Sequence, residues 1–357
     1  MSVGVCAYSF NTGYDAFQLM DMAVEHGLGG VEFPAEDCLP DLSLASLERA
    51  RARAEESGLF VVADGGQVEG EMLRRLIPAA AALGAPTLRM VMSGVLGGDR
   101  RPLSGRWSAH LAGCRDILCE ALPLAEEHGV VISVENHSDA TSHDMRWLCE
   151  ELNSAYIGIT LDVGNVLAVC EEPFGYTERL LPYLRHVHLK DYTIHPSDEG
   201  YRIARCSLGS GVVDYPGLLS LIDGYRGQRG QPGSEGAQDR LAQHDQRGPA
   251  DQSGPAVQHG PAGEITKTIE LGAIYARHVR MLMEDYWAEY PDRDVRDMLP
   301  FLRLYWSHVR PGGEDWRTPR EKDESIEALK AYETREFEES VAYLKEIGAV
   351  RTDSGTS

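Results

Sequence analysis

The stretch from residue 130 to residue 191 contains three short apolar runs, VVISVENH (130–137), IGITLDVGN (157–165) and RHVHLKD (185–191). Each run is rich in Val, Ile or Leu and ends in polar or charged side chains. Longer segments with helical periodicity separate the runs. Short apolar runs that alternate with helices are typical of parallel strands buried on both faces. This stretch therefore predicts repeated βα units.

The same alternation begins at residue 3 and predicts eight units along the chain. The expected strands are Val3–Phe10, Gly30–Phe33, Leu59–Ala63, Thr87–Met92, Val130–Glu135, Ile157–Asp162, His186–Lys190 and Ile265–Glu270. The expected helices are Ala16–His26, Leu44–Ser57, Glu71–Leu83, Arg106–His128, Asp144–Asn153, Tyr176–Arg185 and Tyr215–Tyr225. Eight strands with helical crossovers favour an α/β fold of the (β/α)8 TIM barrel type over a doubly wound sheet.

Two segments depart from this pattern. Residues 226–263 contain eight Gly, seven Gln, four Pro and no aromatic residue. Such a segment cannot bury enough apolar area to offset its ordering entropy, so we expect a disordered insertion; a local reading-frame artefact would look the same. Residues 286–357 add aromatic residues and a charged helix, Pro319–Ile347, which predict a helical C-terminal extension that covers the barrel or a partner subunit. The expected division is a barrel over 1–285 and an extension over 286–357.

Charge and composition exclude several classes of protein. The chain has 34 Lys and Arg against 56 Asp and Glu, a formal charge of −22, which disfavours binding to nucleic acid or anionic lipid. No apolar run is long enough to span a membrane and no signal peptide is evident, so we expect a cytoplasmic protein. The seven cysteines form no CxxC pair and are expected to be reduced, small hydrophobic residues. The aromatic extension makes a homo-oligomer possible.

Polar side chains close four consecutive strands, at the end of a barrel where active sites lie. They are Glu135, Asp162, His188 and Glu270. The intervals from 135 to 162 and from 162 to 188 are each about one βα repeat, which places these side chains at one height on neighbouring strands. Oxygen and nitrogen donors of this kind suit a divalent ion. We expect one ion per chain, Mn²⁺ first, with Mg²⁺ or Co²⁺ as alternatives.

Several further residues near these strand ends have two interpretations each. His137 is a general base or a donor to the substrate, or it orients its loop. Lys190 neutralises an enolate or a phosphate, or it pairs with Asp191 or Glu135. Glu32 binds substrate hydroxyls or braces a metal ligand.

Aromatic and imidazole side chains near the same strand ends are also ambiguous. We expect His186 to face the helical layer, where it packs or makes a supporting hydrogen bond, while His188 faces the barrel. Tyr8, Phe10 and Trp107 either wall a sugar pocket or belong to the core.

The sequence resembles the xylose isomerase-like TIM-barrel superfamily, the sugar phosphate isomerase/epimerase family, over roughly residues 3–285. The resemblance lies in the motifs ENH (135–137), LDVGN (161–165), HVHLKDY (186–192), LGSGVVDY (208–215) and IE (269–270), the last at the end of the eighth strand. The resemblance implies Glu135, Asp162, His188 and Glu270 as metal ligands, with Glu135 and Glu270 also acting as acid and base on opposite faces of the substrate. It implies Arg205 as a contact to substrate hydroxyls.

Two departures from relatives in this superfamily bear on the reaction. Asn165 stands where the ketose 3-epimerases have a His, which alters a substrate contact. The additional histidines of endonuclease IV are missing, which argues against a DNA substrate.

These observations lead to three hypotheses about function. The first is a divalent-metal-dependent sugar isomerase or epimerase that removes an α-proton from a ketose or related keto-sugar through a metal-bound enediolate. The second uses the same site as a lyase or dehydratase on a keto-sugar or inosose, including cleavage of a 3-keto glycoside. The third, a sugar-binding barrel without catalysis, predicts the loss of an acidic ligand, and all four ligands are present.

Overall fold

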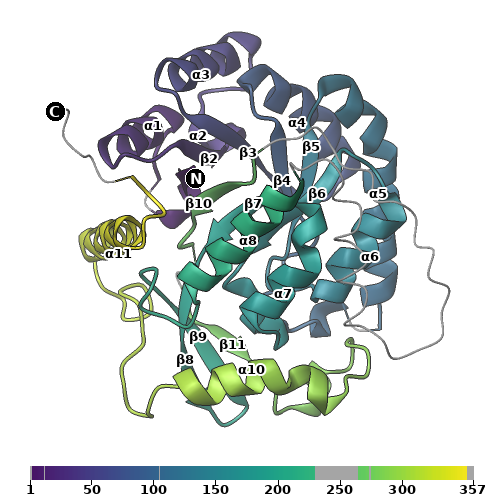
Figure 1. Cartoon of the computed structure of the whole chain (residues 1–357), viewed down its shortest axis with the longest axis vertical. Helices are drawn as coiled ribbons and strands as arrows, with labels where there is room; N and C mark the ends of the chain where they lie inside the picture. Colours follow the sequence, from purple (N-terminus) through teal and green to yellow (C-terminus); the bar gives the residue numbers. More distant parts are fainter. Residues whose placement is uncertain (1, 12, 104, 230–263, 273–274, 352–357) are drawn as a thin grey trace.

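Eight parallel strands close into a barrel in the computed structural model, which describes residues 2–11, 13–103, 105–229, 264–272 and 275–351 (Figure 1). Around the barrel the strands follow the order β1-β2-β3-β4-β5-β6-β7-β10. They are β1 (Val3–Cys6), β2 (Gly30–Pro34), β3 (Phe60–Gln67), β4 (Thr87–Val91), β5 (Val131–Glu135), β6 (Ile157–Asp162), β7 (Leu184–Leu189) and β10 (Thr266–Ile269). The predicted TIM barrel is confirmed.

Helices cover the outside of this barrel (Figure 1). They are α1 (Ala16–Glu25), α2 (Ala35–Cys38), α3 (Leu44–Glu56), α4 (Gly70–Leu83), α5 (Trp107–His128), α6 (Ser142–Leu152), α7 (Pro173–Leu180) and α8 (Tyr215–Arg229). In α1 the buried residues Ala16, Leu19, Met20 and Ala23 follow helical spacing, and a capping box at Asp15 begins the helix. The sequence pattern and the cap thus position the helix with its apolar face on the barrel.

Two predicted elements have different bounds in the structure. β1 ends at Cys6, and Ala7–Ser9 form a 3-10 turn. The Ser9 hydroxyl donates to the Ile269 carbonyl at 2.9 Å, so a side-chain bond replaces the strand ladder there. The helix predicted to end at Arg185 ends at Leu180, followed by a 3-10 turn that contains Pro182. Proline has no N–H to continue an α-helix.

A second, three-stranded sheet was missed in the sequence. It consists of β8 (Asp191–Ser197), β9 (Gly200–Cys206) and β11 (Arg277–Val279), in the order β11-β9-β8. It lies at one end of the molecule beside α10 (Val295–His308), where Tyr201 packs against Phe301 (Figure 1). The sheet extends directly from β7, so it carries Arg205 toward the carboxyl end of the barrel.

The C-terminal region is helical, as predicted, with α10 and α11 (Ile326–Glu346). Residues 319–323 form turns before α11 begins at Ile326, so the charged helix is shorter than expected. Phe337 contacts Phe10 and also His26, the residue after α1, while Tyr343 contacts Tyr215, the first residue of α8. α11 therefore lies between α1 and α8, where the eighth helix of a TIM barrel lies.

Three smaller predictions concern the insertion, the cysteines and membranes. α8 continues to Arg229, into the first residues of the predicted insertion, and residues 230–263 lie outside the described residues. The seven cysteines are free thiols, and five of them are buried. No helix in the described ranges is long and apolar enough to cross a membrane.

Candidate metal centre

The candidate site lies inside the carboxyl end of the barrel. Asp162 on β6 is in register with His188 on β7, as the spacing predicted, whereas Glu135 on β5 is in register with Thr160, two residues before Asp162. The stagger of barrel strands accounts for this offset. Glu270 follows β10 by one residue. Glu135, Asp162 and His188 are fully buried, and Glu270 is 5% exposed.

The imidazole of His188 is held by one nitrogen only. Nε2 lies 2.9 and 3.0 Å from the two carboxylate oxygens of Glu32, so it carries the proton. Nδ1 has no hydrogen-bond partner among the described residues and lies 3.7 Å from Glu135 Oε1 and 4.0 Å from Glu270 Oε2. A carboxylate that fixes the far nitrogen of a histidine is a common support of metal ligands.

The surroundings of His188 favour a cation at Nδ1. Burial lowers the pKa of the His188 imidazole, but the carboxylates of Glu32 and Glu135 raise it. The net pKa of His188 lies well above the ordinary value for histidine. The same carboxylates attract a divalent metal ion for the same electrostatic reason.

Glu135 lies against a buried guanidinium. Arg89 on β4 donates to Glu135 Oε2 and, at 2.8 Å, to Asp64 Oδ1 on β3. The amide of Asn165 is 3.4 Å from the other oxygen, Glu135 Oε1. Burial raises and Arg89 lowers the pKa of Glu135, which ends well below its ordinary value. Oε2 is therefore engaged with Arg89, while Oε1 faces His188.

A lysine joins the other two carboxylates. Lys190 Nζ lies 2.8 Å from Asp162 Oδ2 and contacts Glu270 Oε2. The other oxygen of Asp162 accepts from the N–H of Gly164 at 3.0 Å, and Glu270 Oε1 accepts from Gly272 N at 2.7 Å. A Cβ on Gly272 would come within 2.2 Å of Glu270 Oε1 and 2.9 Å of the Tyr8 carbonyl, so only glycine permits this approach.

This set of residues fits a divalent metal ion. Donor atoms of Glu135, Asp162 and His188 lie within 4.8 Å of one another, and Glu270 is next to His188. Three carboxylates and one imidazole are oxygen and nitrogen ligands of the kind that such ions take. The unpartnered Nδ1 of His188 faces this space, and it is the observation that carries the assignment.

The structure decides between several alternatives. Both oxygens of Glu32 are engaged by histidines, which favours the bracing role over contact with substrate. His186 also donates to Glu32, so it faces the barrel interior, contrary to our prediction. His186 and His188 are two residues apart on one strand and therefore share a face.

Lys190 has other ion-pair partners than the sequence suggested, whereas Trp107 agrees with one of its two interpretations. Lys190 pairs with Asp162 and Glu270, and with neither Asp191 nor Glu135. Asp191 instead accepts backbone N–H bonds from residues 209, 211, 212 and 213. Trp107 is buried in the core and stacks on Arg100, with 3.8 Å from guanidinium carbon to ring centre, which agrees with the core interpretation.

The remaining predicted residues lie around the centre. Burial lowers the pKa of His137 to about 4, so its ring is neutral at pH 7, and Nδ1 has no partner within the described chain. The Tyr192 hydroxyl is 3.3 Å from Asn165 Oδ1. Arg205 donates through Nε to Glu336 of α11 at 2.7 Å. Phe10 packs on Phe337, whereas Tyr8 lies over Arg89 at 5.7 Å.

Asp64 and Arg89 were missed from the sequence. They are in register on β3 and β4, and both are buried. A signal existed, because each is a charged residue inside or directly after an apolar run, in VVADGG (61–66) and TLRMV (87–91). A charge at such a place needs a buried partner.

Comparisons with known proteins agree with this fold. Residues 20–228 match a family model described as "Xylose isomerase-like TIM barrel". The 3-oxo-isoapionate decarboxylase of Pectobacterium atrosepticum is 24% identical over 206 residues, which are 57% of this chain and 71% of that protein.

Two solved structures share the fold at low sequence identity. D-psicose 3-epimerase with D-tagatose, from Clostridium cellulolyticum H10, superimposes with a TM-score of 0.54 at 11% identity, over 87% of this chain and all of that one. The IOLI protein with a bound zinc atom gives 0.51 at 13% identity, over 93% and 99%.

Proposed function

Because this chain belongs to the xylose isomerase-like TIM barrel family, we propose that it is a divalent-metal-dependent sugar isomerase or epimerase acting on a ketose or related keto-sugar. The family predicted from the sequence motifs is confirmed, and the reaction is our proposal. The observation that carries it is the imidazole of His188, whose Nε2 is fixed by Glu32 and whose Nδ1 faces the carboxylates of Glu135 and Glu270.

The proposed ligands are Glu135, Asp162, His188 and Glu270. When bound, a divalent ion supplies a Lewis acid that stabilises negative charge on the oxygen of a carbonyl substrate. Mn²⁺ is the ion that we propose, with Mg²⁺ or Co²⁺ as alternatives. The IOLI structure holds zinc in the same fold.

The proton chemistry is assigned to the chain's own carboxylates. Glu135 and Glu270 approach His188 Nδ1 from β5 and β10, so they flank a substrate placed over that imidazole. One carboxylate removes the proton beside the carbonyl, and the other returns a proton on the opposite face. The ammonium of Lys190, already beside Asp162 and Glu270, adds positive charge near the enediolate oxygen.

A lyase is the second candidate, and the curated relative favours it. The name of that relative describes the removal of a carboxyl group from a 3-oxo acid. Such a reaction leaves an electron pair beside a carbonyl, so it needs the same charge stabilisation as α-proton removal. Loss of a leaving group β to a carbonyl, as in a dehydratase or in opening of a 3-keto glycoside, uses the same groups.

The test is product analysis in D₂O with Mn²⁺-loaded protein and a panel of ketoses, inososes, 3-keto glycosides and 3-oxo sugar acids. An isomerase or epimerase places deuterium on the carbon beside the carbonyl and keeps every other substituent. Release of CO₂ or of a leaving group assigns the lyase. Conversion without deuterium uptake contradicts α-proton removal and indicates a hydride shift.

Metal analysis of two variants tests the ligand set separately. His188→Ala should lose the ion, whereas His308→Ala, which removes an exposed histidine on α10, should keep it. Equal metal content in the two variants would contradict the assignment of His188.

A further inference from the structure

α11 buries two glutamates against the barrel. Glu333 is 1% exposed, and its Oε1 accepts from Asn11 N at 3.0 Å and from Asn11 Nδ2 at 2.6 Å. Glu336 accepts from Arg205 Nε at 2.7 Å. Glu333 and Glu336 are three residues apart on the helix, so they lie on the same face. We call Asn11, Arg205, Glu333 and Glu336 the α11 cluster.

Three polar atoms of the α11 cluster are buried without a partner in the described part of the chain. They are Glu333 Oε2 and both terminal guanidinium nitrogens of Arg205, a residue that is itself 4% exposed. Buried polar groups are nearly always hydrogen-bonded, because an unmade bond costs the full desolvation of the group. An acceptor and two donors left open in one cluster indicate that a ligand completes it.

The α11 cluster lies beside the candidate metal centre. Asn11 follows Ser9, whose hydroxyl bonds to the Ile269 carbonyl and to Leu271 N, on either side of Glu270. Arg205 is the cross-strand partner of Tyr192, two residues beyond Lys190. The cluster therefore flanks the strand ends that carry Glu270 and Lys190, on the side that α11 covers.

The charge of the cluster selects the kind of ligand. The α11 cluster contains two carboxylates, of which Glu336 pairs with Arg205 and Glu333 has no cation partner among the described residues. A phosphate or carboxylate placed there would add a further negative charge. A hydroxyl is neutral, donates one hydrogen bond and accepts others. It can donate to Glu333 Oε2 and accept from Arg205 Nη1 or Nη2.

We propose that the α11 cluster is a binding subsite for hydroxyl groups at the uncharged end of the sugar, and that Glu333 determines this specificity. The proposal rests on the proposed function, in that a sugar occupies the neighbouring centre. It adds that the substrate is not phosphorylated or acidic at the end that reaches α11. The C-terminal helix is then part of the substrate site as well as of the barrel wall.

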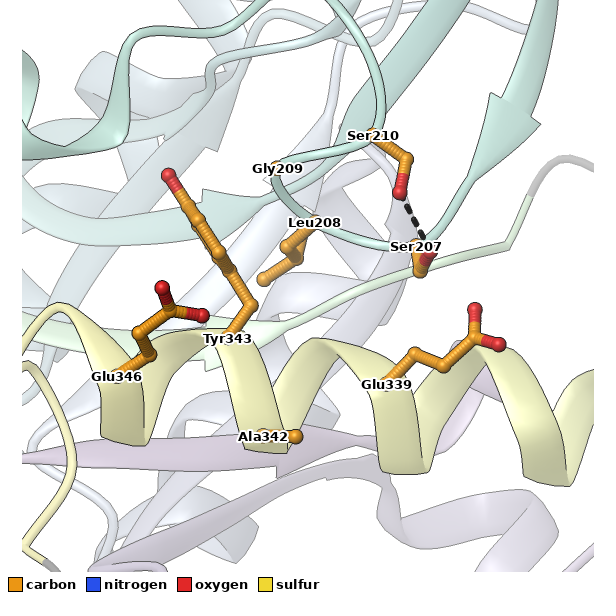
Figure 2. A pocket seen from close by; sticks show the side chains of 8 residues that line it. All are labelled: Ser207, Leu208, Gly209, Ser210, Glu339, Ala342, Tyr343 and Glu346. Carbon is orange, nitrogen blue, oxygen red and sulfur yellow. Dashed lines mark hydrogen bonds between the residues drawn. The ribbon is translucent and has the colours of Figure 1, made fainter.

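A nearby hollow supplies the control. Figure 2 shows it between α11 and the loop Ser207–Ser210, lined by Glu339 and Glu346 as well as Tyr343. Glu339 lies three residues after Glu336 on α11 and is exposed. Glu339→Gln therefore removes one exposed carboxylate from the same helix at a residue outside the α11 cluster.

The experiment uses calorimetric titration of Mn²⁺-loaded wild-type protein, Glu333→Gln and Glu339→Gln. The probes are D-fructose, fructose 6-phosphate and 5-ketogluconate, six-carbon keto-sugars with an uncharged, a phosphorylated and a carboxylate end. D-Fructose should bind the wild type and Glu339→Gln alike and bind Glu333→Gln at least tenfold more weakly. Metal content and the melting temperature without sugar should match between the two variants, and Glu333→Asp should restore part of the affinity.

Two results would overturn the proposal. One is equal affinity of Glu333→Gln and Glu339→Gln for D-fructose, and the other is tighter binding of the phosphorylated or acidic probe than of D-fructose to the wild type. Deuterium exchange in the same samples separates the two proposals. If deuterium exchange occurs but Glu333→Gln and Glu339→Gln bind D-fructose equally, only the subsite is contradicted. If Glu333→Gln binds D-fructose more weakly but no deuterium exchange occurs, only the proposed reaction is contradicted.

Discussion

The two glutamates proposed as acid and base lie on opposite sides of the barrel mouth, and their surroundings differ. On the β5 side, Glu135 is fully buried against Arg89, which Asp64 also holds. On the β10 side, Glu270 is slightly exposed and contacts Lys190, which also contacts Asp162. A guanidinium stays protonated in proteins, whereas a lysine is a flexible ammonium that can move or lose its proton.

The contrast indicates different tasks for the two carboxylates. Arg89 holds Glu135 ionised and oriented, which suits a metal ligand. Against burial, Lys190 also lowers the pKa of Glu270, so the two carboxylates differ in the mobility of their cations. Glu270 is slightly more exposed than Glu135, and its cation is carried by the flexible side chain of Lys190. We therefore expect stability and metal binding to be more sensitive to the loss of Glu135, and proton exchange to be more sensitive to the loss of Glu270.

The largest expected effect comes from comparing Glu135→Gln with Glu270→Gln. Glu135→Gln takes a charged partner from buried Arg89, which should cost about 1.5–3 kcal/mol of unfolding free energy and most of the bound metal. Glu270→Gln should keep its stability, because Lys190 retains Asp162, but should slow exchange on the order of a hundredfold or more. Denaturant unfolding, metal analysis and D₂O exchange measure these losses. Equal stability and equal metal content in the two variants would remove the contrast.

The next effect concerns the support of His188. Glu32→Gln weakens the hold on Nε2 and should lower metal affinity roughly 10- to 100-fold, the usual cost of losing such a partner. Competition with a metal-sensitive dye measures the affinity. The matched control is Glu36→Gln, a change of the same type on α2 at a partly exposed glutamate paired with Arg75. Unchanged affinity in Glu32→Gln would show that His188 needs no brace.

Much of the β10 side could be predicted from the sequence, because its residues close apolar runs at regular intervals. Asp162, His188 and Glu270 were found in this way. The pairing on the β5 side could not, because a charge at Arg89 or Asp64 signals that a buried partner exists without showing which residue it is. Only the closed barrel brings β3, β4 and β5 together so that these charges neutralise one another.

The fold shows the same division between local and distant information. The eight strands follow from periodicity within each segment. The hairpin of β8 and β9 had a local signal as well, because TIHPSDEGYRIA (193–204) places alternating residues around a turn. The place of α11 between α1 and α8 had none, since Phe337 and Phe10 are more than 300 residues apart.

Lys190→Met should have an intermediate effect on thermal stability. It tests the β10 side alone, because Lys190 contacts Asp162 and Glu270. Without the ammonium, Asp162 and Glu270 repel each other until a cation binds between them. Added Mn²⁺ should therefore raise the melting temperature of this variant by a few degrees more than that of the wild type. Thermal unfolding with and without EDTA measures the difference. An equal rise in the melting temperatures of the variant and the wild type on addition of Mn²⁺ would contradict this expectation.

A pH dependence is also expected at Asp139, a buried carboxyl near the β5 side. It forms no ion pair among the described residues, although Arg100 donates to its backbone carbonyl at 2.8 Å. Its Oδ2 accepts from Ser93 Oγ at 2.6 Å, and its Oδ1 has no partner among the residues described. Burial raises the pKa of Asp139 to about 7, against the hydrogen bond from Ser93, which lowers it. The folded protein thus binds this proton more tightly than the unfolded chain, whose pKa is about 4.

The stability from this proton is complete below about pH 4 and is lost as the pH rises toward 7. Asp139→Asn imitates the neutral carboxyl at every pH, so its stability relative to the wild type should rise as the pH goes from 4 to 7. Thermal unfolding from pH 4 to pH 8 measures the gain, with Asp116→Asn at an exposed aspartate of α5 as the control. A difference that stays constant with pH would mean that Asp139 is ionised throughout, and that a buried carboxylate here needs no guanidinium of the kind that Glu135 has.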